Sequence, residues 1–218
     1  MNIRLIRHAT LVLDLNGTRI LVDPMLNPAG TVEAVPDTPN QRRNPLVDLP
    51  FGEDELARVL EEIDAVLVTH THQDHWDERA TELLPKDLQV LCQPEDEELI
   101  RSAGFSEVTP VRTEVEWGGT IFTRTGGQHG TGEIGEKMAP VSGFVLRSAE
   151  APSLYIAGDT VWCPEVEEAL SSYTPDVVVL NAGAARFLSG DPITMTAEDV
   201  AQVSRAVPDA RILAVHME

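Results

Sequence analysis

The segment HTHQDH, residues 70–75, gathers metal-binding side chains in six positions. It holds three of the six histidines of the chain together with Asp74, and it directly follows the apolar run DAVLVT, residues 64–69, which predicts a buried strand. Imidazole and carboxylate groups suit a borderline divalent metal such as zinc. Because a catalytic ion keeps one position open for water, four such groups exceed what one ion takes from the protein. The cluster therefore indicates two ions.

The spacing within this segment also predicts how the side chains are presented. Side chains alternate along a strand, so His70 and His72 are expected to point the same way at its end. Asp74 and His75 fall on the following turn, where the chain bends back toward the same space. A loop held only by hydrogen bonds does not need three imidazoles, which favours a metal site.

Three further residues share one feature, an apolar strand that stops at a metal-capable side chain. They are His129 in TGGQHGTG, Asp159 at the end of LYIAGD and His216 at the end of RILAVH. Taken alone, a histidine at a strand end is more often a capping or core residue than a ligand. Strands of one sheet that end on the same edge would bring all three together.

The composition excludes some function classes. A formal net charge of −20 opposes binding to nucleic acid or to an anionic membrane, since both need a cationic surface. No apolar stretch approaches the ~20 residues of a membrane span. Arg7 and His8 interrupt the first apolar run, which argues against a signal peptide. Two cysteines make no disulfide framework, so we expect a cytoplasmic protein.

The pattern along the chain mixes hairpins with strand–helix units and predicts two sheets with helices packed outside them. Residues 24–52 are rich in Pro, Asn and Asp and predict a long loop. We expect one domain over residues 1–218. Strands are expected over 2–7, 10–15, 19–23, 64–69, 88–92, 106–111, 113–117, 120–125, 143–148, 153–157, 176–182 and 211–216. Helices are expected over 53–62, 77–84, 94–103, 164–171 and 196–206.

These motifs resemble those of the metallo-β-lactamase-fold hydrolases. THTHQDHW resembles the HxHxDH signature of that superfamily, and GGQHG, IAGDT and AVH follow in the expected order. The opening IRHATLVLDLNGTRILVDP is similar to the branch that includes the ascorbate-6-phosphate lactonase-like proteins. The resemblance covers nearly the whole chain. It implies an α/β fold, a four-layer αββα sandwich of two mixed sheets flanked by helices, with the site at one edge between the sheets.

The resemblance also implies a ligand set for two divalent ions, zinc by expectation, with manganese or iron as alternatives. One ion is assigned His70, His72 and His129, the second is assigned Asp74, His75 and His216, and Asp159 is assigned to both. Asp74 and His216 are also expected to act catalytically, Asp74 by orienting a hydroxide. The chain ends two residues after His216, so we expect the second ion to be held less securely.

The predicted activity is hydrolysis of a small-molecule ester, lactone or phosphodiester by a hydroxide bridging two ions. Homo-oligomers are compatible with this prediction. A metal-binding protein without turnover remains an alternative. The negative charge disfavours an RNA-processing nuclease. Gln73 in the signature and the absence of a flavin domain disfavour a di-iron protein of the superfamily.

Six residues near these motifs have open roles. His8 is either a pocket residue or a structural hydrogen-bonding group, and Asp23 either supports a ligand histidine or starts the turn at Pro24. Trp162 either lines a pocket or packs in the core. Arg186 binds a substrate anion or lies at the surface. Cys163 is a candidate soft ligand that the proposed set does not need, and Cys92 is expected to be a small buried hydrophobe.

Overall fold

A computed structural model describes residues 1–138, 140–149 and 151–218. The chain divides into two compact units. The N-terminal unit comprises residues 1–36, 40–110 and 218, and the C-terminal unit comprises residues 37–39 and 111–217. Whether the two units behave as the single domain predicted from the sequence stays a prediction.

The N-terminal unit is built on a six-stranded mixed sheet in the order β1-β2-β3-β4-β5-β6. Strand β2 runs antiparallel to β1 and β3, and β3 to β6 run parallel to one another. The carboxyl ends of β1, β3, β4, β5 and β6 therefore lie on one edge. The strands are β1 (Asn2–Arg7), β2 (Thr10–Leu15), β3 (Thr18–Val22), β4 (Ala65–Val68), β5 (Gln89–Cys92) and β6 (Val108–Pro110).

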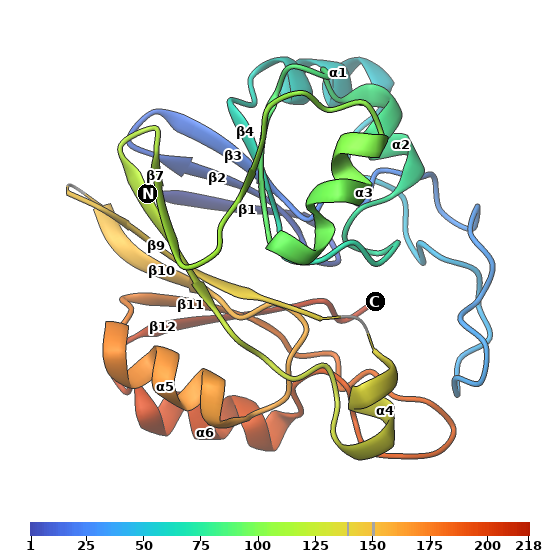
Figure 1. Ribbon diagram of the computed structural model, residues 1–218. Helices are drawn as coiled ribbons and strands as arrows, with labels where there is room; N and C mark the ends of the chain where they lie inside the picture. The colour runs from blue at the N-terminus through green and yellow to red at the C-terminus, as the bar shows by residue number, and fades with distance from the viewer. Residues whose placement is uncertain (139, 150) are drawn as a thin grey trace. The chain divides into compact units, whose positions relative to one another are not determined.

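Three short helices follow these strands and cover one face of the sheet (Figure 1). They are α1 (Glu53–Glu61), α2 (Glu78–Leu83) and α3 (Glu97–Ser102), the last preceded by the 3₁₀ turn η1 (Pro94–Asp96). Leu56 and Leu60 of α1, Ala80 of α2 and Ile100 of α3 join one buried apolar cluster with the strands. This packing fixes the end of β4, which leads into the HTHQDH segment.

The C-terminal unit contains a second six-stranded mixed sheet, in the order β12-β11-β10-β9-β8-β7. Strands β10, β11 and β12 are parallel, and β9 is antiparallel to both β10 and β8, so β8, β10, β11 and β12 end on one edge. The strands are β7 (Glu114–Trp117), β8 (Thr120–Thr125), β9 (Gly143–Ser148), β10 (Ala151–Ile156), β11 (Val177–Asn181) and β12 (Arg211–Val215).

Helices α5 (Pro164–Tyr173) and α6 (Ala197–Ala206) run side by side along this second sheet (Figure 1). Val166 and Leu170 of α5 and Val203 of α6 pack with Tyr155 and Val178 of the strands. The helix expected over residues 196–206 opens with a capping box: the Thr196 side chain accepts from the backbone of Asp199, whose carboxylate accepts from the backbone of Thr196. The prediction of two mixed sheets with flanking helices is confirmed.

Two local differences from the sequence analysis concern the site. Strand β4 ends at Val68, so His70 and His72 lie in a loop beyond it, and strand alternation does not orient them as expected. The segment after His129 contains a helix that the sequence did not indicate, α4 (Gly132–Lys137). Its two glycines give it a low intrinsic helix propensity, which is why no helical pattern appeared there.

The loop over residues 24–52 is irregular, as predicted, but its beginning is fixed to the sheet. The buried Arg7 guanidinium donates to the carbonyl oxygens of Met25, Asn27 and Val47. Burial lowers the pKa of Arg7, with the carboxylate of Asp77 acting in the opposite direction. None of the helices in the described ranges has the length and apolar character that a membrane crossing requires.

We expect Arg7→Met to lower the free energy of unfolding by about 3 kcal/mol, because three carbonyls, that of Met25 buried and the other two partly buried, lose a charged donor. Urea unfolding followed by circular dichroism measures this change. Arg4→Met is the matched control on the same strand, since Arg4 is exposed and its ion pair with Glu55 is long at 3.7 Å. Equal stability of the two variants would show that Arg7 does not fix the loop.

Candidate metal centre

The loop after β4 brings two predicted ligands of the N-terminal unit together. Nε2 of His70 lies 3.0 Å from Nδ1 of His72, and the two rings meet edge to face with centroids 4.5 Å apart. Two nitrogen ligands on one tetrahedral zinc, each bound at ~2.0–2.1 Å, are about 3.3 Å apart. The observed 3.0 Å is short enough for a hydrogen bond and is also close to this ligand spacing, so the two nitrogens can face one ion.

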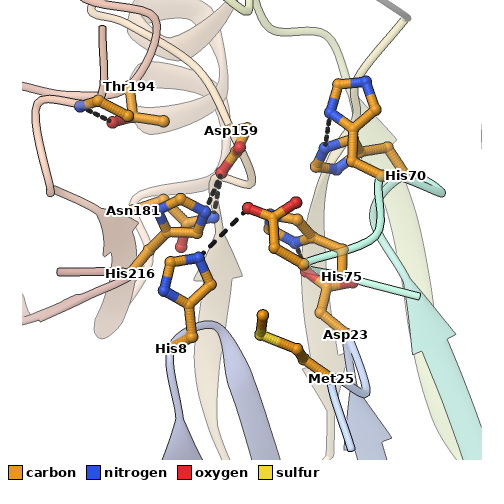
Figure 2. Close-up of polar contacts among 12 residues, drawn as sticks. His8, Asp23, Met25, His70, His75, Asp159, Asn181, Thr194 and His216 are labelled. Atoms are coloured by element: carbon orange, nitrogen blue, oxygen red, sulfur yellow. Dashed lines mark hydrogen bonds and ion pairs between the residues drawn. The ribbon is translucent and has the colours of Figure 1, made fainter. Parts of the chain in front are cut away.

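Asp23 is the shared acceptor behind this loop, and it sits directly after β3 with a left-handed backbone (φ 45°). Its Oδ2 accepts from Nδ1 of His75 at 2.8 Å and from the Thr69 hydroxyl at 2.7 Å, and its Oδ1 accepts from the Thr69 amide at 2.8 Å. Thr69 Oγ1 in turn lies 3.1 Å from Nδ1 of His70. Figure 2 shows Asp23 beside His75.

These bonds fix the tautomers of two histidines. When Nδ1 of His75 donates to Asp23 and Nδ1 of His70 donates to Thr69, the Nε2 atom of each ring carries the lone pair that a metal needs. Of the two roles left open for Asp23, the hydrogen bond to His75 favours support of a predicted ligand histidine. The carboxylate supports His75 directly and His70 through Thr69.

His8 follows β1 and has a left-handed backbone (φ 53°), which turns its ring to the same edge of the sheet. Its Nε2 lies 3.3 Å from Oδ2 of Asp74, and Nε2 of His75 lies 3.8 Å from the same oxygen. His8 is buried, whereas the Asp74 side chain is partly exposed. This contact favours the site role for His8 over a purely structural bond within the N-terminal strand.

A second buried carboxylate, that of Asp96, also holds this loop. Asp96 accepts from the hydroxyl of Thr71, the residue between His70 and His72, and from the amide of Gln93, both at 2.8 Å. Burial raises the pKa of Asp96, and these two hydrogen bonds lower it. The conformation of the HTHQDH segment is thus set by Asp23 and Asp96 together.

In the C-terminal unit, Asp159 faces two histidines with two different oxygens. Its Oδ2 lies 3.5 Å from Nε2 of His129, and its Oδ1 lies 3.5 Å from Nε2 of His216. These separations exceed a hydrogen bond and match two ligands of one ion at ~2.0–2.2 Å each. A carboxylate so placed can give one oxygen to each of two ions.

Two hydrogen bonds orient this group. Asn181, the last residue of β11, donates its side-chain amide to Oδ1 of Asp159 at 2.6 Å, as Figure 2 shows. Nδ1 of His129 donates to the carbonyl of Ile193 at 2.9 Å, which leaves its Nε2 directed at Asp159. His216 follows β12 directly with a left-handed backbone (φ 61°).

We expect Asn181→Ala to weaken metal binding by about tenfold, because Asp159 loses the donor that orients it. Isothermal titration with zinc measures the affinity. Asn181→Asp should be worse than Asn181→Ala, since a second anion beside Oδ1 repels the first. If both variants bind zinc as tightly as the unmodified protein, Asn181 has no part in positioning Asp159.

Each unit therefore carries its own converging set of predicted ligands. The N-terminal set is His70, His72, Asp74 and His75, and the C-terminal set is His129, Asp159 and His216. Sequence reasoning missed Asn181 and Asp96 as supporting residues. Like the predicted ligands of its unit, Asn181 lies at the end of an apolar strand. Its side chain is an amide, which is ordinary at a strand end, so its position did not single it out.

The remaining candidates lie outside these sets. Trp162 packs against the apolar cluster of the C-terminal unit, and Arg186 is exposed, in agreement with a surface role. Burial raises the pKa of the Cys163 thiol, which contacts Thr160 at 3.5 Å. Cys92 is fully buried in β5, as expected, with its pKa raised to about 12.

The donor set fits divalent metal binding. It combines oriented imidazole nitrogens with carboxylate oxygens at ligand–ligand separations of 3.0 to 3.8 Å within each unit. Two such mixed sheets with histidines and aspartates at their strand ends define a metal-dependent hydrolase of the metallo-β-lactamase fold. Residues 18–217 match the family model described as a β-lactamase superfamily domain, so the chain belongs to that superfamily.

Relatives agree with this assignment. The chain is 38% identical to the UPF0173 protein YddR of Bacillus subtilis over 221 residues, which cover 100% of this chain and 86% of the relative. A UPF0173 metal-dependent hydrolase of Azorhizobium caulinodans is 26% identical, with coverage of 87% and 76%.

Solved structures lead to the same family. A "possible metal-dependent hydrolase" from Veillonella parvula is 38% identical with a TM-score of 0.93, covering 98% of this chain and 84% of the other. An isothiocyanate hydrolase from Delia radicum gut bacteria is 37% identical with a TM-score of 0.91, covering 100% and 85%.

Proposed function

We propose that the chain is a dinuclear metallohydrolase acting on a small molecule. The observation that carries this proposal is the geometry of Asp159, whose two oxygens each face a different histidine at 3.5 Å. In the proposed centre, His70, His72 and His129 would hold one ion, and Asp74, His75 and His216 would hold the other. Asp159 belongs to both, and zinc is the metal that the imidazole-rich set favours.

When bound, two such ions lower the pKa of a water and polarise the electrophile. The residues of the chain then have distinct tasks. Asp23 keeps His75, and the Ile193 carbonyl keeps His129, in the tautomer with Nε2 deprotonated. Asp74, which contacts His8, would orient the attacking oxygen as well as bind metal. His216 is the second residue to which we assign a catalytic role.

The substrates we propose are small esters, lactones or phosphodiesters. The similarity to an isothiocyanate hydrolase adds a second candidate, the electrophilic carbon of an isothiocyanate group. The net charge of −20 supports a small molecule over nucleic acid, because an RNA backbone would meet repulsion.

The test combines metal analysis with a substrate screen. Protein purified without added metal is analysed by mass spectrometry for metal content and assayed with 4-nitrophenyl esters, lactones, bis(4-nitrophenyl) phosphate and benzyl isothiocyanate. We expect two ions per chain and metal-dependent turnover of one class. His72→Ala should lose both metal and rate, whereas Gln73→Ala, exposed in the same loop, should keep its metal. Full turnover in His72→Ala would disprove the proposed ligand set.

A further inference from the structure

A cavity of about 440 Å³ opens in the C-terminal unit beside His129. The described residues that line it all come from one segment, 127–141, which comprises the loop after β8, helix α4 and the residues that follow the helix. Its volume lies within the range of small-molecule sites. Because His129 is one wall and also a proposed metal ligand, a molecule in this cavity lies next to the proposed reacting centre.

Close packing fixes the shape of this cavity. A Cβ on Gly135 of α4 would lie 2.6 Å from the carbonyl oxygen of Gly130, so the helix rests directly on the loop that carries His129. Gly130 has a left-handed backbone (φ 95°), and a Cβ there would lie 2.9 Å from Ile193. The two glycines allow α4 to approach His129, and any larger residue would move the wall.

The lining is mostly uncharged. Met138, Pro140 and Val141 supply apolar surface after α4, while Gln128 and Thr131 supply neutral polar groups. Among the described residues that line the cavity, Glu136 is the only charged one apart from the titratable His129, and none is a lysine or arginine. An anionic group here would meet an acidic side chain and no basic one, whereas a neutral, partly apolar group finds matching surface.

We propose that this cavity binds the uncharged organic group of the substrate and that Glu136 disfavours anionic substrates. The inference rests on the proposed function, since it assigns the cavity to a substrate hydrolysed beside His129. It narrows the substrate class to neutral esters, lactones or isothiocyanates and ranks phosphodiesters below them.

A binding experiment tests the cavity without relying on turnover. Metal-loaded, ¹⁵N-labelled protein is titrated with butyl methyl sulfone, a neutral probe, and with butanesulfonate, an anion of similar size and weak metal affinity. We expect the sulfone to shift the amide signals of Gly130, Gly132 and Gly135, and butanesulfonate to shift them less. Met138→Trp, which fills the cavity, should abolish the shifts. Sulfone shifts confined to other residues, or equal shifts with both probes, would overturn the proposal.

A kinetic experiment tests the role of Glu136. The ratio of kcat/KM for 4-nitrophenyl succinate, an anion, to that for 4-nitrophenyl butyrate is measured in Glu136→Lys. We expect this ratio to rise about tenfold, which corresponds to ~1.4 kcal/mol. Glu168→Lys, the same charge change on the exposed face of α5, should leave the ratio unchanged. Equal ratios in the two variants would contradict a selective role for Glu136.

The turnover screen tests the proposed function, and the binding experiment tests the cavity, so the two proposals can fail separately. Absence of metal-dependent turnover in the unmodified protein would count against the proposed function alone. The binding experiment would still decide whether the cavity takes neutral molecules.

Discussion

Replacing Asp159 with alanine should reduce the bound metal to below one ion per chain and lower kcat/KM by about a thousandfold. The reason lies in the two oxygens of this carboxylate, each 3.5 Å from the Nε2 atom of a different histidine. No other residue of the C-terminal set can contribute to both proposed ions, so removal of Asp159 takes a ligand from each. Metal content by mass spectrometry and steady-state kinetics measure the two effects.

Two further variants sharpen this experiment. Asp159→Asn keeps the shape of the side chain but removes its negative charge, and we expect it to retain more metal than alanine but less than the unmodified protein. Asp209→Ala removes an exposed carboxylate from the same unit and should change neither quantity. If Asp159→Ala keeps two ions and its rate, the carboxylate does not belong to a dinuclear centre.

The second large effect is expected at Asp23, which touches no proposed metal position but holds two ligand histidines. Asp23→Ala removes the acceptor of three hydrogen bonds, from the Thr69 amide, the Thr69 hydroxyl and Nδ1 of His75. We expect metal affinity to fall about 10–100-fold, because the rings lose their orientation. Stability of the metal-free protein should fall by about 3 kcal/mol, since buried donors lose their partner.

Competition with a chelator measures the affinity, and denaturation in the presence of a chelator measures the stability. Asp64→Ala is the matched control, because Asp64 also accepts a backbone hydrogen bond next to β3, from Arg19 at 2.8 Å, but is exposed. A purely structural role for Asp23 predicts a loss of stability with unchanged affinity of the folded protein for zinc. That outcome would contradict the role argued for this carboxylate.

Much of the fold could be read from hydrophobic patterning, because buried strands and amphipathic helices have distinct periods. Helix α4 could not, since its two glycines lower its helix propensity, and Gly135 serves close packing against Gly130. The ligand candidates could be read from residue types at strand ends. The hydrogen bonds made by Asp23, Asp96 and Asn181 could not be predicted from the sequence. Their partners depend on backbone turns, such as the left-handed turn at Asp23.

The two thiols offer a way to check the integrity of every variant described above. Cys92 lies in the N-terminal unit and Cys163 in the C-terminal unit, and both are buried. Burial raises the pKa of each thiol, so little reactive thiolate exists in the native state at neutral pH. Alkylation rates at these two positions therefore report local opening separately for each half of the chain, which distinguishes a variant that has lost its ions from one that has lost its structure.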